Sequence, residues 1–312
     1  MKIWVAAILF LVGCAPQTLI VGTPVRSAAL ATDTLIMEDA ARLPLRVWRA
    51  TEPRAIILGV HGFNDYSRAF EMPGTWFAER GVTFYAYDQR GFGKAPGHGK
   101  WAGTDVLTGD LRTAIRLLQE YHPETPLFVI GTSMGGAVAL SAVGDGGIDV
   151  NGLVLVAPAV WGWSTMNPLY RTTLWLAAHT APDYTLTGEG LERWPSDNME
   201  MLRAFSRDPL VIKETRIDAI YGLVDLMEAA YLSIEAVKPP TLLLYGEKDE
   251  IIPRGPVSDI RSRFGKALTT KDYPDGWHML LRDLQREVVW QDINAWMAEF
   301  GQNRGAGLTP VN

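Results

Sequence analysis

The chain has 312 residues, 47% apolar and 21% charged, so it can bury one large core with room for an inserted subdomain. The net charge of −6 and pI near 5.5, with no long block of like charge, argue against a nucleic-acid-binding protein. The chain has five histidines and one cysteine. The sequence contains no metal-binding pair and no phosphate-binding glycine pattern, so we predict neither a metal nor a cofactor.

The first residues have the pattern of an export signal. Met1 and Lys2 give a positive start, and Ile3–Val12 is an unbroken run of ten apolar residues. A membrane-spanning helix needs about 20 such residues, so this run is typical of a cleaved signal peptide. The run leads into Cys14, and Leu11–Cys14 resembles the bacterial lipoprotein box, in which the peptide is cut before a cysteine that is then lipidated.

This resemblance implies a signal peptide over residues 1–13 and a lipidated tether over residues 14–31. Ala15 stands where an aspartate is linked with retention in the inner membrane. We therefore expect an exported bacterial lipoprotein, anchored to the outer membrane through Cys14, with its domain in the periplasm. The alternative is an ordinary cleaved signal with an incidental cysteine.

Strand and helix patterns alternate through most of the remaining chain. Thr34–Met37 and Leu43–Ala50 are expected to open it as an antiparallel pair. This alternation predicts an α/β fold, with a mostly parallel sheet covered by helices on both faces, over residues 32–160 and 238–301. Residues 302–312 are expected to form a C-terminal tail. The later strands are predicted at Ala55–Val60, Val82–Tyr87, Leu127–Ile130, Gly152–Val156, Thr241–Tyr245 and Leu268–Tyr273.

Residues 161–237 interrupt this alternation and contain no convincing strand. The segment is too long for an ordinary loop, and helical patterns recur at Leu169–His179, Met199–Phe205 and Ala219–Ile234. We interpret it as an inserted helical cap over the functional site. The alternative for each apolar side chain is that it only packs the cap against the core and does not line a pocket. The candidates for a substrate pocket are Trp161, Trp163, Trp175, Leu223 and Met227.

A serine stands at the junction of a predicted strand and a small-residue helical stretch. Gly131–Gly135 fits the pattern G-x-S-x-G, with Ser133 at its centre. On such a turn the serine backbone is strained, the hydroxyl is exposed above the sheet, and the next N–H points at the oxygen under attack. Ser133 is therefore the predicted nucleophile and the N–H of Met134 a predicted oxyanion donor. A glycine-rich turn that only packs a helix on a sheet is the alternative.

A serine nucleophile needs a base, and in this architecture the base follows in the order Ser, Asp or Glu, His. Of the two histidines after Ser133, His179 lies in the cap and His278 follows the last strand. His278 is therefore the predicted base. The three earlier histidines, His61, His98 and His122, are expected to be structural.

The orienting acid is expected just after Thr241–Tyr245, where three acidic residues compete. Asp249 is preferred because its short side chain loses less freedom when it holds an imidazole, and Glu250 is second. Solvated loop charge is the alternative, and we expect it for Glu247 and Glu250. A second oxyanion donor is expected after the first parallel strand, and the N–H of Phe63 occupies that place.

With these residues, the chain resembles the α/β-hydrolases, and within them the monoacylglycerol lipase and lysophospholipase group. In that group a serine, an aspartate and a histidine form the triad, and the residues after His-Gly and after Ser form the oxyanion hole. The resemblance assigns these roles to Ser133, Asp249, His278, Phe63 and Met134. The matching stretches are His61–Phe63, Tyr87–Gly93, Gly131–Gly136, Asp249–Pro253 and Trp277–His278.

The chain departs from this group at two places near the predicted site. Thr132 stands where the group often has a histidine, and Asn64–Tyr66 stands where it often has Gly-Glu-His. Neither change affects the triad. Both bear on the choice of substrate.

The sequence thus predicts a serine hydrolase that cleaves acyl esters through an acyl-enzyme, without a cofactor. Membrane anchoring and an apolar cap favour a lipid-like substrate, such as a lysophospholipid or a monoglyceride. Peptidase, C–C hydrolase or haloperoxidase chemistry on the same triad is the first alternative. A non-catalytic lipoprotein that binds a ligand in the cap is the second.

Overall fold

The computed structural model describes residues 15–144, 149–188, 190, 192–264 and 268–300. The predicted signal peptide, Cys14 and the tail at 302–312 lie outside the described residues. Within the described part of the chain, no helix combines the length and apolarity needed to cross a bilayer.

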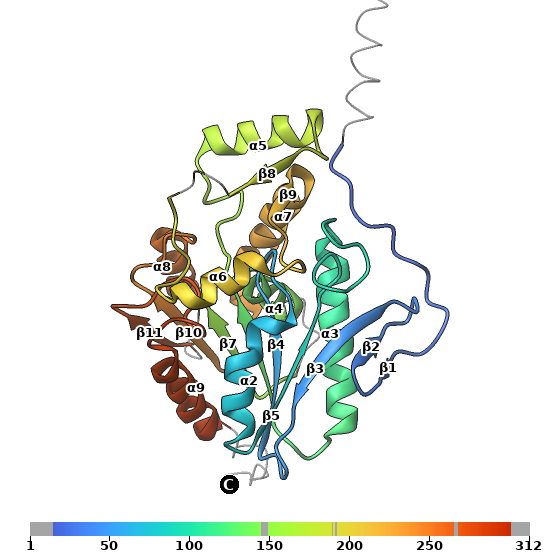
Figure 1. Cartoon of the computed structure of the whole chain (residues 1–312), viewed down its shortest axis with the longest axis vertical. Coiled ribbons are helices and arrows are strands. Elements are labelled where there is room, and N and C mark those ends of the chain that lie inside the picture. The colour runs from blue at the N-terminus through green and yellow to red at the C-terminus, as the bar shows by residue number, and fades with distance from the viewer. Residues whose placement is uncertain (1–14, 145–148, 189, 191, 265–267, 301–312) are drawn as a thin grey trace, which may run out of the picture.

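A nine-stranded sheet forms the centre of the molecule, in the order β1-β2-β3-β5-β4-β6-β7-β10-β11 (Figure 1). The strands β5, β4, β6, β7, β10 and β11 are parallel, whereas β1, β2 and β3 pair antiparallel at one edge. The fold is therefore the predicted α/β architecture with a mostly parallel sheet. The strands are β1 (Ala29–Leu30), β2 (Thr34–Ile36), β3 (Arg42–Trp48), β4 (Ala55–Val60), β5 (Val82–Tyr87), β6 (Leu127–Thr132), β7 (Gly152–Val156), β10 (Thr241–Gly246) and β11 (Leu268–Tyr273).

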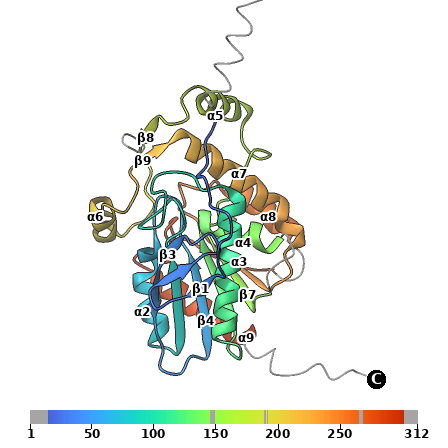
Figure 2. The same cartoon turned by 90° about the vertical axis from the view of Figure 1, so that its right-hand side faces the viewer.

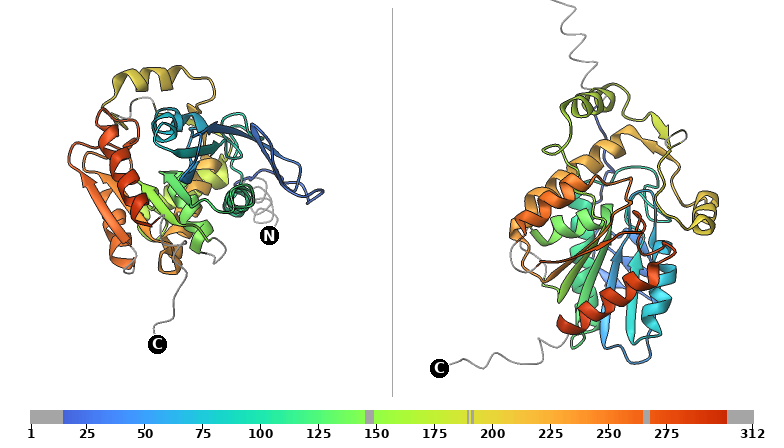
Figure 3. Two further views of the ribbon diagram at one scale, coloured as in Figure 1. Left: turned by 90° about the horizontal axis from the view of Figure 1, so that it is seen from below. Right: turned by 90° about the vertical axis from the view of Figure 1, so that its left-hand side faces the viewer.

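Helices cover both faces of the sheet (Figures 1 and 3). One face carries α3 (Thr104–Tyr121), α4 (Met134–Gly144) and α8 (Arg254–Arg263), and the other carries α2 (Glu71–Ala78), preceded by the 3-10 turn η1 (Ser67–Phe70), and α9 (Arg286–Phe300). Alternate side chains of β4 enter the two cores: Ile56 and Leu58 on the α3 face, Ile57 on the α2 face. Burial on both faces explains why the parallel strands are continuous apolar runs in the sequence.

The cap lies above the carboxyl ends of the parallel strands (Figures 1 and 2). The expectation of a cap without strands is wrong, because β8 and β9 pair antiparallel within it. Each has only three residues, and all three residues of β8 are exposed, so neither strand produces an alternating apolar pattern. The cap elements are α5 (Pro168–Thr180), β8 (Thr185–Thr187), α6 (Met199–Arg207), β9 (Glu214–Arg216), α7 (Ile217–Ser233) and the 3-10 turn η2 (Ile234–Ala236).

The segment predicted as a tether contacts the core over much of its described length. The N–H of Leu19 donates to the carbonyl of Trp101 (2.8 Å), and that of Val25 donates to Glu38 (2.8 Å). Its last residues form β1, which pairs with β2. Residues 15–31 are thus part of the folded body, a role that their small, polar composition did not reveal.

Candidate active site

Ser133 occupies a sharp turn between β6 and α4. Its backbone φ is +50°, in the left-handed region that strains any residue other than glycine. The turn is held on both sides: the Ser133 N–H donates to the carbonyl of Val156 (3.0 Å), and the Ser133 carbonyl accepts from Ala159 (3.0 Å) and Gly136 (2.9 Å). This is the backbone that the G-x-S-x-G pattern predicted.

Both glycines of the motif are required by close approach of backbone atoms. A Cβ on Gly131 would lie 2.5 Å from the carbonyl oxygen of Gly135. A Cβ on Gly135 would overlap the carbonyl of Val60 and lie 2.7 Å from that of His61. The first turn of α4 therefore lies directly against the end of β4, where the oxyanion loop begins.

Asp249 and His278 are brought together from loops 29 positions apart in the chain. The carboxylate Oδ2 of Asp249 lies 2.8 Å from Nδ1 of His278, and its Oδ1 accepts the N–H groups of Ile251 (2.8 Å) and Ile252 (2.9 Å). The Asp249 side chain is fully buried and that of His278 is 9% exposed. With Nδ1–H donating to the carboxylate, Nε2 of His278 is left to act as a base.

The competing acids of this loop have other partners. Glu250 accepts the backbone N–H of Trp194 in the cap (2.8 Å), and Glu247 forms an exposed ion pair with Arg254 (3.8 Å). Glu250 thus ties the cap to the core. The geometry favours Asp249 as the partner of the histidine.

The loop after β4 approaches Ser133 at Gly62. A Cβ on Gly62 would lie 3.3 Å from Cβ of Ser133, so the following residue, Phe63, is close to Ser133. The Phe63 ring packs edge-on against Phe92, with centroids 5.7 Å apart, and this contact anchors the loop. Met134, the other predicted donor, begins α4 with its side chain fully buried. Both residues predicted to donate an N–H therefore lie near Ser133, Met134 as its neighbour in the chain and Phe63 through the approach of Gly62.

Two residues that the sequence reasoning missed hold the histidine loop. Asp283 is fully buried and accepts the N–H of Trp277 (2.8 Å) and the hydroxyl of Ser196 in the cap (2.6 Å). Burial raises the pKa of the Asp283 carboxyl, although these hydrogen bonds oppose the shift. Arg282 forms an ion pair with Asp65 (2.5 Å), whose side chain is only 6% exposed, just after the oxyanion loop. The contacts with Ser196 and Asp65 join segments 87 and 217 positions apart in the chain, so no local sequence pattern predicts them.

The early histidines are structural in their contacts. His61 is fully buried: its Nδ1 donates to the carbonyl of Gly62 (2.8 Å) and its Nε2 accepts the N–H of Gln89 (3.0 Å). Burial lowers its pKa, so the ring is neutral. His98 bonds to the carbonyl of Gly93 (2.9 Å) and His122 to the hydroxyl of Tyr85 (2.8 Å).

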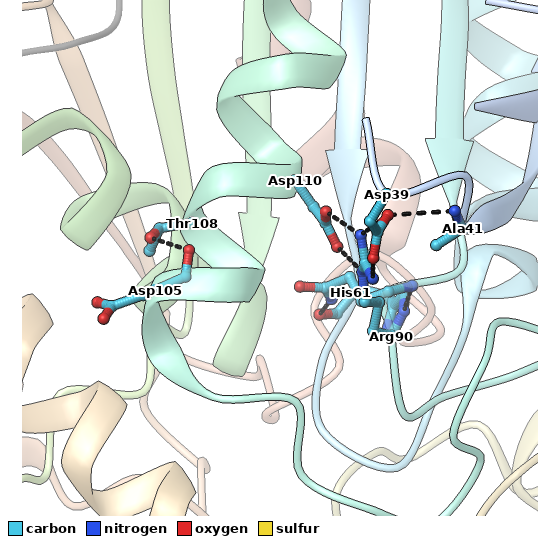
Figure 4. Close-up of polar contacts among 8 residues, drawn as sticks. Asp39, Ala41, His61, Arg90, Asp105, Thr108 and Asp110 are labelled. Atoms are coloured by element: carbon cyan, nitrogen blue, oxygen red, sulfur yellow. Dashed lines mark hydrogen bonds and ion pairs between the residues drawn. The ribbon is translucent and has the colours of Figure 1, made fainter. Parts of the chain in front are cut away.

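The neighbouring Tyr87–Gly93 stretch is ordered by a buried cluster of charges. Figure 4 shows Arg90 between Asp39 and Asp110. Arg90 donates to both carboxylates, at 2.5 Å to Asp39 and 2.7 Å to Asp110. The hydrogen bond from Arg90 lowers the pKa of Asp39, whereas burial raises that of Asp110. These side chains fix the loop beneath the oxyanion residues.

The residues predicted to line a substrate pocket separate into two groups. Trp163 and Trp175 line one pocket of about 650 Å³ between α5 and α7, together with Pro168, Arg171, Thr172 and Tyr221. Met227 is 5% exposed and belongs to the main hydrophobic core. Trp161 and Leu223 are partly buried and pack against this core. Neither Ser133 nor His278 is among the described residues that line this pocket.

Comparison with known proteins places this architecture in a family. Residues 51–285 match the family model Hydrolase_4, described as serine aminopeptidase, S33. The chain therefore belongs to this family of hydrolases, and its fold is that of the α/β-hydrolases.

The chain is also similar to monoacylglycerol lipases, as its motifs indicated. It is 24% identical to the monoacylglycerol lipase of Mycolicibacterium smegmatis over 263 residues, which cover 82% of this chain and 92% of that one. It is 26% identical to the mouse monoglyceride lipase over 290 residues, with coverage of 88% and 93%. A soluble variant of the Saccharomyces cerevisiae monoglyceride lipase superposes with a TM-score of 0.73 at 21% identity, covering 92% of this chain and 99% of that structure.

Proposed function

We propose that this protein is a serine esterase that cleaves acyl esters of lipid-like substrates through an acyl-enzyme. The observation that carries the proposal is the buried Asp249–His278 pair, 2.8 Å apart, at the sheet edge where Ser133 lies on a strained turn. A histidine with its Nδ1–H held by a buried carboxylate presents Nε2 in the tautomer that can accept a proton.

In the proposed reaction, Oγ of Ser133 attacks the ester carbonyl carbon while Nε2 of His278 takes the hydroxyl proton. The carbonyl oxygen becomes an oxyanion, which the N–H groups of Phe63 and Met134 stabilise. The tetrahedral intermediate collapses, the C–O bond breaks, and His278 gives its proton to the leaving alcohol. A water molecule then attacks the acyl-enzyme with His278 as base, releasing the fatty acid and restoring Ser133.

The proposed substrate class rests on the relatives and on the cap. The relatives include proteins named monoacylglycerol lipase and monoglyceride lipase. The cap pocket lined by Trp163 and Trp175, whose lining includes neither Ser133 nor His278, offers aromatic side chains that part of an acyl chain can contact. A monoglyceride or a lysophospholipid, each with one acyl chain and a polar head, fits this combination.

We further propose that the chain is a lipoprotein of the outer membrane, lipidated at Cys14, with its domain in the periplasm. The support is the apolar run Ile3–Val12 that ends in a lipoprotein-like box. Such an anchor would hold the enzyme beside the membrane lipids that supply its substrate.

The family description raises a second candidate, an aminopeptidase on the same triad. Such an enzyme must bind a free α-amino group, and a carboxylate near the oxyanion loop would serve this purpose. Asp65 lies there but is buried and paired with Arg282. This pairing favours the esterase over the peptidase.

A substrate panel with wild type and Ser133→Ala tests the proposal. We expect the wild type to hydrolyse long-chain monoglycerides and lysophospholipids, and Ser133→Ala to lose this activity and its labelling by a fluorophosphonate. A marked preference for short soluble esters would contradict the substrate class, and turnover of aminoacyl-anilides in place of esters would favour the peptidase. A folded wild type that the fluorophosphonate leaves unlabelled would indicate a binding protein.

A further inference from the structure

A short stretch of the cap runs along the two loops that carry Asp249 and His278. This stretch, Arg193–Asn198, which we call the cap arm, connects β8 to α6 and leads from the outer end of the cap down towards the core (Figure 1). Its six residues form neither helix nor strand. Even so, Ser196 is only 1% exposed and Asn198 only 9%. Polar side chains that are buried in this way need specific hydrogen-bond partners.

On one side of His278, the cap arm bonds directly to the backbone. The carbonyl of Pro195 accepts the N–H of Met279 (2.8 Å), which is the residue after His278. Asn198 adds a second bond to the same loop, because its Nδ2 donates to the carbonyl of Arg282 (2.9 Å). The backbone that follows the histidine is therefore bonded to the cap at two points.

On the other side of His278, the cap arm acts through the buried Asp283. One carboxylate oxygen of Asp283 accepts the N–H of Trp277 (2.8 Å), the residue before His278, and the other accepts the hydroxyl of Ser196 (2.6 Å). Asp283 is fully buried, where an oxygen without a hydrogen-bond partner is costly. The position of Asp283, and with it that of the Trp277 N–H, therefore depends on the cap arm.

The cap arm also reaches the loop of Asp249. The next residue, Glu250, accepts the backbone N–H of Trp194 with its carboxylate (2.8 Å) and the guanidinium of Arg193 with its carbonyl (3.2 Å). Asp249 itself lies 2.8 Å from Nδ1 of His278. The same six residues thus bridge the two loops whose separation determines the length of this hydrogen bond.

We propose that the cap arm is a positioning element for the base, and that it holds His278 where Asp249 and Ser133 can use it. This role rests on the proposed esterase function. Ser196 and Asn198 act through the backbone of the histidine loop and make no contact with the substrate. Because the arm belongs to the cap, a movement of the cap at this segment also loosens His278. The cap is therefore part of the support for the chemistry, in addition to its part in substrate selection.

An isosteric change at Asn198 removes one contact and keeps another. Asn198→Asp replaces the NH₂ group that donates to Arg282, while Oδ1 can still cap α6 by accepting the N–H of Met201 (3.1 Å). Asn167→Asp is the matched control, because Asn167 caps α5 in the same way on the exposed surface. With a short soluble ester, we expect Asn198→Asp to lower kcat at least about tenfold and to change KM less than about twofold. Asn167→Asp should change neither.

A second variant tests the side of the loop that depends on Asp283. Ser196→Ala removes the hydroxyl that Asp283 accepts, and Ser206→Ala, which removes an exposed hydroxyl on α6, is its control. We expect Ser196→Ala to lower kcat at least about tenfold and to slow the labelling of Ser133 by a fluorophosphonate by a similar factor. Ser206→Ala should label at the wild-type rate.

The hydrogen bond between His278 and Asp249 gives a readout that does not depend on turnover. Its Nδ1–H proton is expected at low field in the proton NMR spectrum, and the loss of this signal in Asp249→Asn assigns it. In Asn198→Asp and Ser196→Ala we expect the signal to shift or broaden, and in both controls to stay as in the wild type. A variant that only destabilised the fold would keep the wild-type signal in its folded fraction, which denaturant unfolding measures.

The outcomes separate the role of the cap arm from the proposed activity. An unchanged kcat with an unchanged NMR signal in both variants would overturn this role. A rise in KM alone would also overturn it and assign the arm to substrate binding, as would equal losses of activity in variants and controls. If the wild type hydrolyses no ester but its NMR signal responds to both arm variants, the esterase fails and the positioning of His278 stands. If the signal does not respond either, both proposals fail.

Discussion

The carboxyl ends of the central strands, where Ser133 lies, and the cap above them differ in how tightly they are packed. In α4, which begins beside Ser133, ten of the eleven residues are buried, and its first turn touches β4 backbone to backbone. In the cap, α6 has no buried residue and α5 has one. Dense packing thus holds the turn at Ser133 in place, as its strained backbone requires. Among the helices of the cap, only α7, with eight buried residues, packs firmly on the core, so the outer part that holds α5 and α6 is the loosely buried one.

The largest effect is expected when a residue of the proposed triad is changed without a change of shape. Asp249→Asn should reduce kcat for ester hydrolysis by about 10³- to 10⁴-fold, because the amide favours the wrong imidazole tautomer. Glu247→Gln, in the same loop but exposed, should retain nearly full activity. Steady-state hydrolysis of a soluble ester measures both, and equal losses in the two variants would contradict the role of Asp249.

The tight packing around Ser133 can be tested at Gly135, in the first turn of α4. Gly135→Ala should lower the free energy of unfolding by about 3 kcal/mol or more, because the methyl group meets the Val60 and His61 carbonyls. Gly109→Ala, in α3, meets nothing within 4 Å and should stabilise the fold by about 1 kcal/mol. Denaturant unfolding gives both values, and a neutral Gly135→Ala would show that the edge is less tightly packed than described.

The next largest effect is expected when the ion pair between Arg282, in the loop of His278, and Asp65, after the loop of Phe63, is removed. Arg282→Met leaves the Asp65 carboxylate buried without its cation and should cost about 3 kcal/mol of stability. It should also lower kcat more than it raises KM, because the two loops carry a predicted oxyanion donor and the predicted base. Lys248→Met breaks an exposed pair with Asp275 and should cost less than about 1 kcal/mol. Equal stability losses would contradict the importance of burial.

In the cap, substitutions should alter substrate selection more than stability. Trp175→Ala should raise KM for long-chain esters several-fold while costing about 1 kcal/mol or less, because the ring is 45% exposed. Trp194→Ala is the control, since that ring is 49% exposed and lies outside the aromatic pocket. A chain-length series with both variants checks this, and an unchanged KM for Trp175→Ala would remove the pocket from substrate binding.

The smallest effect concerns pH and the buried His61. Because burial lowers its pKa below the unfolded value of 6.5, the unfolded chain binds more protons in acid, and stability falls as the pH drops below about 6.5. The limiting slope is about 1.4 kcal/mol per pH unit. His61→Gln should reduce this slope. A smaller pH dependence should remain, because burial also lowers the pKa of His122. Unfolding curves between pH 5 and 8 would contradict this account if the variant kept the full slope.

Much of the fold could be predicted because its signals are local. The parallel strands are buried on both faces, so each appears as a short apolar run, and the predicted limits differ from the observed ones by two residues or fewer. The helices α5, α6 and α7 were predicted within two residues at each end. The strands β1, β8 and β9 were missed because two- or three-residue strands at an edge carry no pattern.

By itself, the sequence was enough to predict Ser133, Asp249 and His278 as the residues for the chemistry, because the G-x-S-x-G turn and the loops after the last two strands are recognised from neighbours in the chain. Only the tertiary structure decided that Asp249, and not Glu250, meets His278, and that Arg282 and Asp283 hold the loop of the histidine. The Asp249–His278 and Arg282–Asp65 contacts join residues 29 and 217 positions apart. Such choices follow from the packing of the whole chain, and composition and spacing carry no record of them.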